Sequence, residues 1–379
     1  MSDENPLASI EECFSNLHDP RVIGRCDHKL LDLIVIAICA VICNADDWVG
    51  VETFGRAKES WLSQFLELPN GIPSPHTFRR FFAALDAEAF QGSFTRWVES
   101  VFRVTKGQVV AIDGKTVRRS GDKTIGKNAI HMVSAWANSN GIVLGQRKID
   151  DKSNEITAIP ELLELLNVSG CIVTIDAMGC QKKIAKAIRD GKADYVLRVK
   201  ENQGNLYRDI EDWFKFTEDD NSPDMTHTHH RTVNKGHGRI EIRDSYVVND
   251  PLAFEYIRHY EGWPDLNSVA MVVRERRIGD KIQKDVAYYI SSLDDDAELI
   301  LTCSRAHWSV ENSLHWILDM IFREDESRIR SGNSPQNFAV LRHFAINVLK
   351  KDTSKGSMKQ KRFKAALDDT FLLRLLEQV

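Results

Sequence analysis

QVVAIDGKT (residues 108–116) opens the stretch that decides the fold, because this apolar run of strand type carries one carboxylate, Asp113. Polar and glycine-containing breaks separate it from further short runs with strand or helix periodicity. The pattern predicts an α/β fold with the order strand, strand, strand, helix, strand, helix, strand. The segments after the first strand are NAIHMVSAWAN (128–138), GIVLGQRKI (141–149), EITAIPELLELL (155–166), CIVTIDAM (171–178), QKKIAKAIRDG (181–191) and DYVLRVK (194–200).

Residues 1–105 precede this core and have helical periodicity. Leu30–Cys43 is strongly apolar but shorter than the roughly 20 residues that span a bilayer, so we predict a buried helix. Ser74 and Pro75 mark the start of another helix, which would expose Arg79 and Arg80. Such a helical unit could dock in a DNA groove, or it could be a plain helical bundle with solvated arginines.

Residues 201–292 follow the core and predict a β-rich insertion after an acidic, His-rich connection. Within it, GHGRIEIR (236–243) alternates charged and apolar residues, so Arg239 would share one face with its charged neighbours. That face could be solvated or could contact DNA. Residues 293–350 are predicted to complete the core with a helix from about 297 to 320, and residues 351–379 form a basic C-terminal tail.

Composition limits the class of protein. The chain has 379 residues, 42% of them hydrophobic, which suffices for sizeable cores. Its net charge of -5 does not by itself favour a nucleic-acid partner, although seven Lys or Arg and one acid lie between Lys350 and Lys364. Seven scattered cysteines and an acidic N-terminus, MSDENPLASIEE, predict neither a disulfide framework nor export, so we expect a cytoplasmic protein.

Three carboxylates stand out. Asp113 lies inside the first apolar strand, and Asp176 lies at the end of the fourth, where ligands of open α/β sheets gather, although either could merely cap the turn that follows. Glu311 lies on a largely apolar helical stretch between His307 and His315, so it could be a ligand or a buried Glu bonded to histidine. The spacing does not match a helical zinc motif.

Carboxylates from two strands and a helix would form a hard, all-oxygen ligand set. Such a set suits Mg²⁺ or Mn²⁺, and two such ions activate an attacking hydroxyl and stabilise a leaving oxygen in phosphodiester chemistry. The sequence therefore predicts a nuclease or strand-transfer site at Asp113, Asp176 and Glu311.

Motifs spread over nearly the whole chain resemble the H-repeat-associated transposases, a bacterial insertion-sequence group of the DDE class. They include HKLLDLIVIAICAVICNADDW, LPNGIPSPHTF, AIDGKTVRRS, DKSNEITAIPELL, TIDAMGCQ, HGRIEIR, YYISS, HWSVENSLHWILD and LRHFAINVL. The resemblance implies a ribonuclease-H-like core (106–200, completed by 293–350), two Mg²⁺ or Mn²⁺ ions on the three carboxylates, and double-stranded DNA as substrate. It also implies DNA contacts, which would be made by Lys115, Arg118, Arg119, Lys200, Asn202 and Gln203.

One position departs from related groups, because His307 stands four residues before Glu311 where an Arg is usual. His307 itself, Arg305 or nearby lysines would then contact the DNA phosphate. Trp136, Trp263 and Trp316 could stack on a flipped base or pack in the core. The resemblance implies cleavage at element ends and strand transfer by a homodimer in a synaptic complex at the bacterial nucleoid. Two alternatives remain, a transposition-inactive DNA-binding remnant and a plain Mg²⁺-dependent nuclease.

Overall fold

The computed structural model describes residues 7–378 except 23, 25, 123, 125, 150–153, 219–226 and 237. His237 of the GHGRIEIR motif and the first residues of the DKSNEITAIPELL motif therefore lie outside the described residues. None of the helices within the described ranges has the length and apolarity that a membrane crossing requires.

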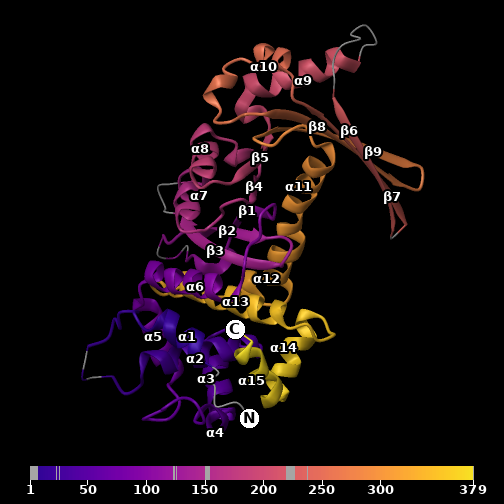
Figure 1. Cartoon of the computed structure of the whole chain (residues 1–379). Helices are drawn as coiled ribbons and strands as arrows, with labels where there is room; N and C mark the ends of the chain where they lie inside the picture. Colours follow the sequence, from indigo (N-terminus) through magenta and orange to yellow (C-terminus); the bar gives the residue numbers. More distant parts are fainter. Residues whose placement is uncertain are drawn as a thin grey trace.

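The central feature is one mixed sheet to which nine strands of the described residues contribute, in the order β3-β2-β1-β4-β5-β9-β8-β7-β6 (Figure 1). The predicted succession of strands and helices from residue 108 to 200 is confirmed. The strands are β1 (Val109–Thr116), β2 (His131–Ala137), β3 (Ile142–Ile149), β4 (Ile172–Ile175), β5 (Asp194–Val199), β6 (Thr228–Gly236), β7 (Arg239–Val248), β8 (Ser268–Ile278) and β9 (Lys281–Ser291).

Helices cover the sheet on both faces. In β1, Val109 packs with residues of α11, whereas Val110 belongs to the larger core that includes α7, because successive strand residues point to opposite faces. Helices α7 and α8 therefore lie on one face and α11 on the other (Figure 1). The elements from β3 onward are α7 (Glu155–Glu164), η3 (Ala177–Gly179), α8 (Lys182–Asp190), η4 (Glu201–Gln203), α9 (Gly204–Glu218), α10 (Pro251–Tyr256), η5 (Tyr260–Gly262), α11 (Ala297–Ser309), the π-helical turn η6 (Val310–His315), α12 (Trp316–Met320) and η7 (Glu324–Glu326).

The N-terminal region is helical, as predicted, and its apolar run forms a helix of which Leu33–Ile42 is buried. On α5, Arg79 and Arg80 are exposed while Phe78 is buried, which confirms the predicted orientation of that helix. The helices are α1 (Ala8–Phe14), α2 (Leu30–Ile42), α3 (Trp48–Ala57), α4 (Glu59–Leu62), α5 (Pro75–Ala84), α6 (Ala87–Val101), and, after β1, the short η1 (Arg118–Ser120).

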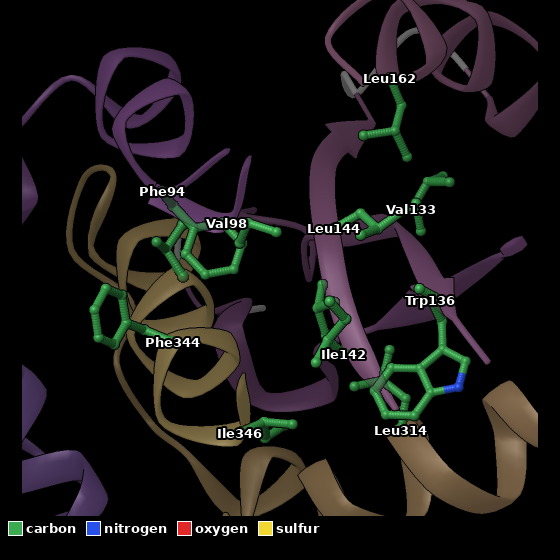
Figure 2. Close-up of a cluster of buried hydrophobic side chains, with 14 of the residues drawn as sticks. Phe94, Val98, Val133, Trp136, Ile142, Leu144, Leu162, Leu314, Phe344 and Ile346 are labelled. Atoms are coloured by element: carbon green, nitrogen blue, oxygen red, sulfur yellow. The ribbon is translucent and has the colours of Figure 1, made fainter. Parts of the chain in front are cut away.

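The C-terminal part packs against these helices. It consists of α13 (Ser334–Lys351), α14 (Met358–Leu367) and α15 (Asp369–Glu377), and α13 is buried along nearly its whole length. Phe344 of α13 packs with Phe94 of α6, and Ile346 lies near Ile142 of β3, so a single apolar cluster joins the helical region to the sheet (Figure 2). Most of the segment that was described as a basic C-terminal tail, residues 358–377, thus consists of two packed helices.

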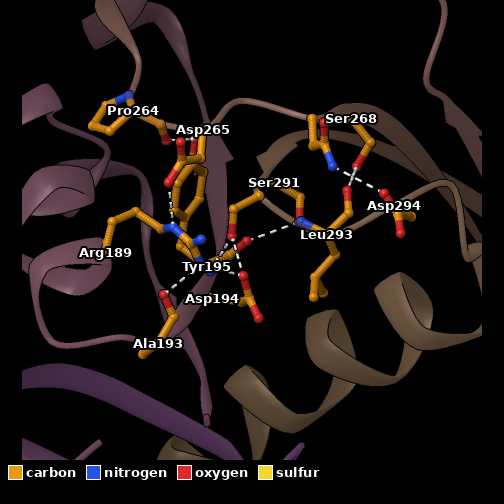
Figure 3. A network of polar contacts seen from close by, with 12 residues as sticks. Arg189, Ala193, Asp194, Tyr195, Pro264, Asp265, Ser268, Ser291, Leu293 and Asp294 are labelled. Atoms are coloured by element: carbon orange, nitrogen blue, oxygen red, sulfur yellow. Dashed lines mark hydrogen bonds and ion pairs between the residues drawn. The ribbon is translucent and has the colours of Figure 1, made fainter. Parts of the chain in front are cut away.

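The insertion extends the core sheet. β9 pairs antiparallel with β5, although about 90 residues separate them in sequence, and the hydroxyl of Ser291 donates to the Tyr195 carbonyl at 2.8 Å. The Tyr195 hydroxyl donates to the Pro264 carbonyl at 3.0 Å, and Arg189 pairs with Asp265 at 2.8 Å (Figure 3). The insertion is therefore fixed to the strand that follows α8.

Candidate active site

Strand register places two of the predicted carboxylates side by side. β1 and β4 are parallel, and their last paired residues are Ile112 and Ile175, so Asp113 and Asp176 are the next residues on adjacent strands. Neighbouring strands lie about 4.8 Å apart. Both residues have the side-chain parity of Val109, which packs against α11, so both carboxylates face the helix that leads to Glu311.

Asp176 caps the turn that follows it. Its Oδ1 accepts hydrogen bonds from the backbone N–H groups of Met178 at 3.0 Å and Gly179 at 3.4 Å. Turn capping, which the sequence offered as an alternative to a functional role, is therefore present. It does not exclude that role, because these two bonds engage one carboxylate oxygen and fix the direction of the side chain.

Asn202 and Gln203 support this same turn. The Asn202 amide donates to the carbonyl of Ala177 at 2.7 Å, and the Gln203 amide donates to the carbonyl of Cys180 at 2.9 Å. Both residues follow β5, so they tie the end of that strand to the turn that carries Asp176. Their amide groups are engaged with protein, whereas the resemblance implied that they face DNA.

Glu311 lies in the π-helical turn between α11 and α12. The N–H of Trp316 donates to the carbonyl of Glu311, five residues earlier, which is the bonding pattern of a π-helix. Such turns are rare and often occur at functional sites. Glu311 is exposed, so the alternative of a buried Glu bonded to histidine is wrong. The sequence periodicity predicted a continuous α-helix and did not show this turn.

The two histidines near Glu311 point elsewhere. His315 Nδ1 lies 3.6 Å from Asp113 Oδ2, and His307 Nδ1 lies 3.4 Å from the hydroxyl of Thr174. Burial lowers the pKa of His315 to about 4 and also lowers the pKa of His307. His307 is half-buried and lines a small pocket with Thr174 and Tyr289 of the sheet, which argues against its predicted contact with DNA phosphate.

Asp113 is the electrostatic centre of the site. Burial raises the pKa of its carboxyl to about 7, although the N–H of Gly114 acts in the opposite direction. Repulsion from the carboxylates of Asp176, Glu155 and Glu311 raises this pKa further. The predicted carboxylates therefore lie close enough to interact. Within the described residues, however, no three His, Cys, Asp or Glu side chains are grouped tightly enough to hold a metal ion.

Glu155 was not predicted as a site residue. It begins α7 and forms an ion pair with His131, Oε1 to Nε2, at 2.7 Å. A Cβ on Gly114 would lie 2.1 Å from Glu155 Oε1, so the glycine that follows Asp113 is required for the close approach of this carboxylate. The sequence feature that could have indicated Glu155 is its position at the start of the helix that follows the third strand.

Lys115 lies inside the protein. Its Nζ is 2.7 Å from Asp319, 3.1 Å from Glu324 and 3.3 Å from Asp325, and only 12% of its side chain is exposed. Burial lowers the pKa of Lys115, but the attraction of Glu324 and Asp319 outweighs it, so the net shift is upward. These contacts tie β1 to the segment after Glu311 and argue against the expected DNA contact.

The other cations expected to contact DNA are at the surface. Arg119, Lys200 and Arg305 are exposed, and 77% of the Arg118 side chain is exposed beside Asp325. Arg239 is partly exposed and pairs with Glu241 at 2.9 Å. Their positions leave them accessible to a phosphate backbone.

Comparison with known proteins identifies the family. A model described as "Transposase DDE domain" matches residues 104–348, and one described as "DDE_Tnp_1-associated" matches residues 11–98. The chain belongs to the DDE transposase family. The transposase is therefore a DNA-cleaving and DNA-transferring enzyme of a family that acts on DNA and generally uses divalent metal ions.

Relatives agree with this assignment. The transposase is 42% identical to "Putative transposase YncI" of Escherichia coli O157:H7, over 98% of this chain and 95% of that protein. It is 40% identical to "H repeat-associated putative transposase YhhI" of Escherichia coli strain K12, over 98% of each chain. A solved piggyBac transposase synaptic complex with hairpin DNA is similar at a TM-score of 0.44 and 12% identity, covering 98% of this chain and 81% of that one.

Proposed function

We propose that the transposase cuts DNA at the ends of its insertion sequence and transfers the freed 3′ end into target DNA, with Asp113, Asp176 and Glu311 as catalytic carboxylates. The observation that carries this proposal is the parallel register of β1 and β4, which brings the two aspartates together under the helix of Glu311. The mutual repulsion of the carboxylates supports it, because a cluster of negative charge favours cation binding.

The chemistry of the three carboxylates suits a divalent metal centre, although the described side chains are not gathered into a metal-binding group. The three side chains offer oxygen donors only, which suits Mg²⁺ or Mn²⁺, and the expected number is two ions. When bound, such ions supply charge stabilisation and activation of the attacking oxygen. The chain itself fixes Asp176 through the turn that Asn202 and Gln203 brace, and it holds Asp113 on a strand that Lys115 ties to the segment after Glu311.

The domain organisation follows from the same proposal. A ribonuclease-H-like core would comprise residues 106–200 and 293–350, with the insertion at 201–292 and a helical unit at 1–105. The strand order β3-β2-β1-β4-β5 within the core, and the attachment of the insertion through β9, support this division. Residues 351–379 would belong to the helical unit, because α14 and α15 pack on it.

DNA would lie across the exposed cations near the site. Arg118 and Arg119 follow β1 directly, and Arg330 donates to the Arg119 carbonyl at 3.0 Å. A cleft of about 620 Å³ continues from there to the start of α5. Its lining includes Arg79 and Arg328, and also the acids Asp46, Asp47 and Glu326. Arginine is well suited to phosphate, so this cleft is where the N-terminal helical region would hold an element end.

The proposed setting is a homodimer that pairs two ends at the bacterial nucleoid. Two alternatives share the fold and differ in outcome: an inactive DNA-binding remnant would bind ends without cutting, and a plain nuclease would cut without end preference or joining.

The test incubates the protein with DNA that carries the flanking ends of its own gene, in Mg²⁺ or Mn²⁺, and resolves nicked and joined products. The proposal expects end-specific cutting and joining that disappear in Asp176→Asn and Glu311→Gln. Glu201→Gln, an exposed carboxylate near the site, is the matched control and should retain activity. Retained cutting in Glu311→Gln would contradict the assignment of the third carboxylate.

A further inference from the structure

Arg198 of β5 lies in the same row of side chains as the two aspartates of the candidate site. β4 and β5 pair in parallel up to the residues that directly precede Asp176 and Arg198, so these two are the next residues on adjacent strands. On its other side, Arg198 pairs with Tyr289 of β9. Asp113, Asp176 and Arg198 therefore occupy neighbouring positions across β1, β4 and β5, with about 4.8 Å from one strand to the next.

The side chain of Arg198 lies on the face of the sheet that α11 covers (Figure 1). Val196, two residues earlier, packs with α11, and strand residues two apart point to the same face. Arg198 lines a small pocket with His307 and Trp308 of α11. Burial lowers the pKa of His307, and the positive charge of Arg198 lowers it further. The guanidinium group thus lies near the helical turn that leads to Glu311.

Arg198 lacks a negatively charged partner among the residues that the structure describes. The side chain is half-buried, and its Nε is buried without a hydrogen-bond partner. Other cations nearby are paired, since Lys115 contacts three carboxylates and Arg274 pairs with Asp285. Keeping a charged group partly out of water without a partner costs free energy. An unpaired guanidinium beside the candidate site therefore favours an anionic ligand.

Two residues that the sequence offered for the phosphate contact are less well placed. Because burial lowers its pKa, His307 is uncharged at neutral pH, and its Nδ1 lies 3.4 Å from the hydroxyl of Thr174. Arg305 is exposed and follows Ser304, whose hydroxyl is hydrogen-bonded to that of Tyr289 at 2.8 Å. Since each residue turns an α-helix by about 100°, Arg305 lies off the side of α11 that contacts the sheet.

We propose that Arg198 binds the phosphate group at the DNA cleavage site, beside Asp176. The inference rests on the proposed function, because it assigns a residue to the DNA that the three carboxylates would cut. A guanidinium group donates two parallel hydrogen bonds to phosphate oxygens and keeps its charge at every pH at which the protein would act. Arg198 thereby offsets the repulsion between the phosphate and the two aspartates and holds the phosphate at the strand ends.

The experiment measures binding of fluorescently labelled element ends with divalent ions chelated, so that no DNA is cut. Two duplexes differ only at the cleavage position, which carries either the normal phosphodiester or a neutral methylphosphonate. Wild-type protein should bind the methylphosphonate duplex about tenfold more weakly, since a charge-assisted hydrogen bond is worth roughly that factor or more. Arg198→Met should bind the normal duplex about tenfold more weakly than wild type does and should bind both duplexes equally. The two losses do not add because each change removes the same contact.

Arg277→Met is the matched control. Arg277 is a strand arginine on the opposite face of the sheet, because Val272, five residues earlier, packs with α11. Arg277 pairs with Glu275 and should be replaceable without loss of the discrimination between the two duplexes. Arg198→Lys keeps the charge but loses the planar fork, so it should retain part of the discrimination. Urea denaturation of Arg198→Met should give a stability near that of the wild type, since no ion pair is lost.

Failure of this inference is distinguishable from failure of the proposed function. If the protein cuts and joins its own ends while Arg198→Met still discriminates the two duplexes tenfold, the phosphate contact is wrong and the transposase proposal stands. Equal binding of both duplexes by the wild type, or loss of the discrimination in Arg305→Met alone, would also overturn the contact. Absence of cutting and of end binding in the wild type would refute the proposed function itself.

Discussion

Replacing Lys115 with Met would separate two roles for this residue, a DNA contact or an internal tie. Its Nζ lies within 3.3 Å of three carboxylates, and Glu324, with 3% of its side chain exposed, cannot regain hydration without unfolding. Removing one partner of a buried ion pair costs about 3–5 kcal/mol. Because Glu324 keeps its ion pair with Arg342 at 3.3 Å, and Asp319 and Asp325 are partly solvated, we expect a loss near the lower end, about 3 kcal/mol in the free energy of unfolding.

Urea denaturation followed by circular dichroism measures this loss, and fluorescence anisotropy without metal measures DNA affinity. The matched control is Arg118→Met, whose exposed pair with Asp325 should contribute at most about 1 kcal/mol. The double variant Lys115→Met with Asp319→Asn should recover part of the lost stability, because it removes one uncompensated charge. Unchanged stability of Lys115→Met together with weaker DNA binding would refute the internal tie.

Three further outcomes are expected. Burial lowers the pKa of His343 from the ordinary 6.5 to about 4, so between these values the unfolded chain binds a proton that the folded chain does not, and stability decreases as the pH is lowered. In urea melts the free energy of unfolding should decrease by about 2 kcal/mol between pH 7 and pH 5 through His343, and His343→Asn should remove this contribution. Asn202→Ala should reduce cutting at least tenfold with little effect on end binding, because the amide only braces the turn of Asp176; equal losses in both assays would indicate a DNA contact instead. Gly114→Ala should displace Glu155 and lower activity, measured by end cleavage, whereas activity near wild type would show that this contact is dispensable.

Local patterns in the sequence predicted much of the fold. The strand and helix order from residue 108 to 200 is read from the spacing of apolar residues, which is a local property. The buried helix of the N-terminal region was predicted for the same reason. Asp113 and Asp176 were found because a single charge within an apolar strand, or directly after one, is visible without knowledge of any contact.

Contacts between distant segments were not predictable in this way. The pairing of β9 with β5 joins residues about 90 positions apart, and no local pattern specifies which edge the insertion extends. Residues 351–379 were expected to form a basic tail, but Arg362 is buried and donates to backbone carbonyls of Ile321 and Val41. From the sequence alone, Arg362 was counted with the surface charges, because the carbonyl groups that it binds lie far away in the chain.

By itself, the sequence determined the secondary-structure order, the two strands that carry or precede Asp113 and Asp176, and the family motifs. Tertiary structure decided which groups meet: the register that aligns the two aspartates, the burial of Lys115 among acids, and the π-helical turn that carries Glu311. The physical reason is that the periodicity of apolar residues reports local backbone geometry and burial. The partner of a charged side chain depends instead on packing against segments far away in sequence, and so does the one extra residue of a π-helical turn.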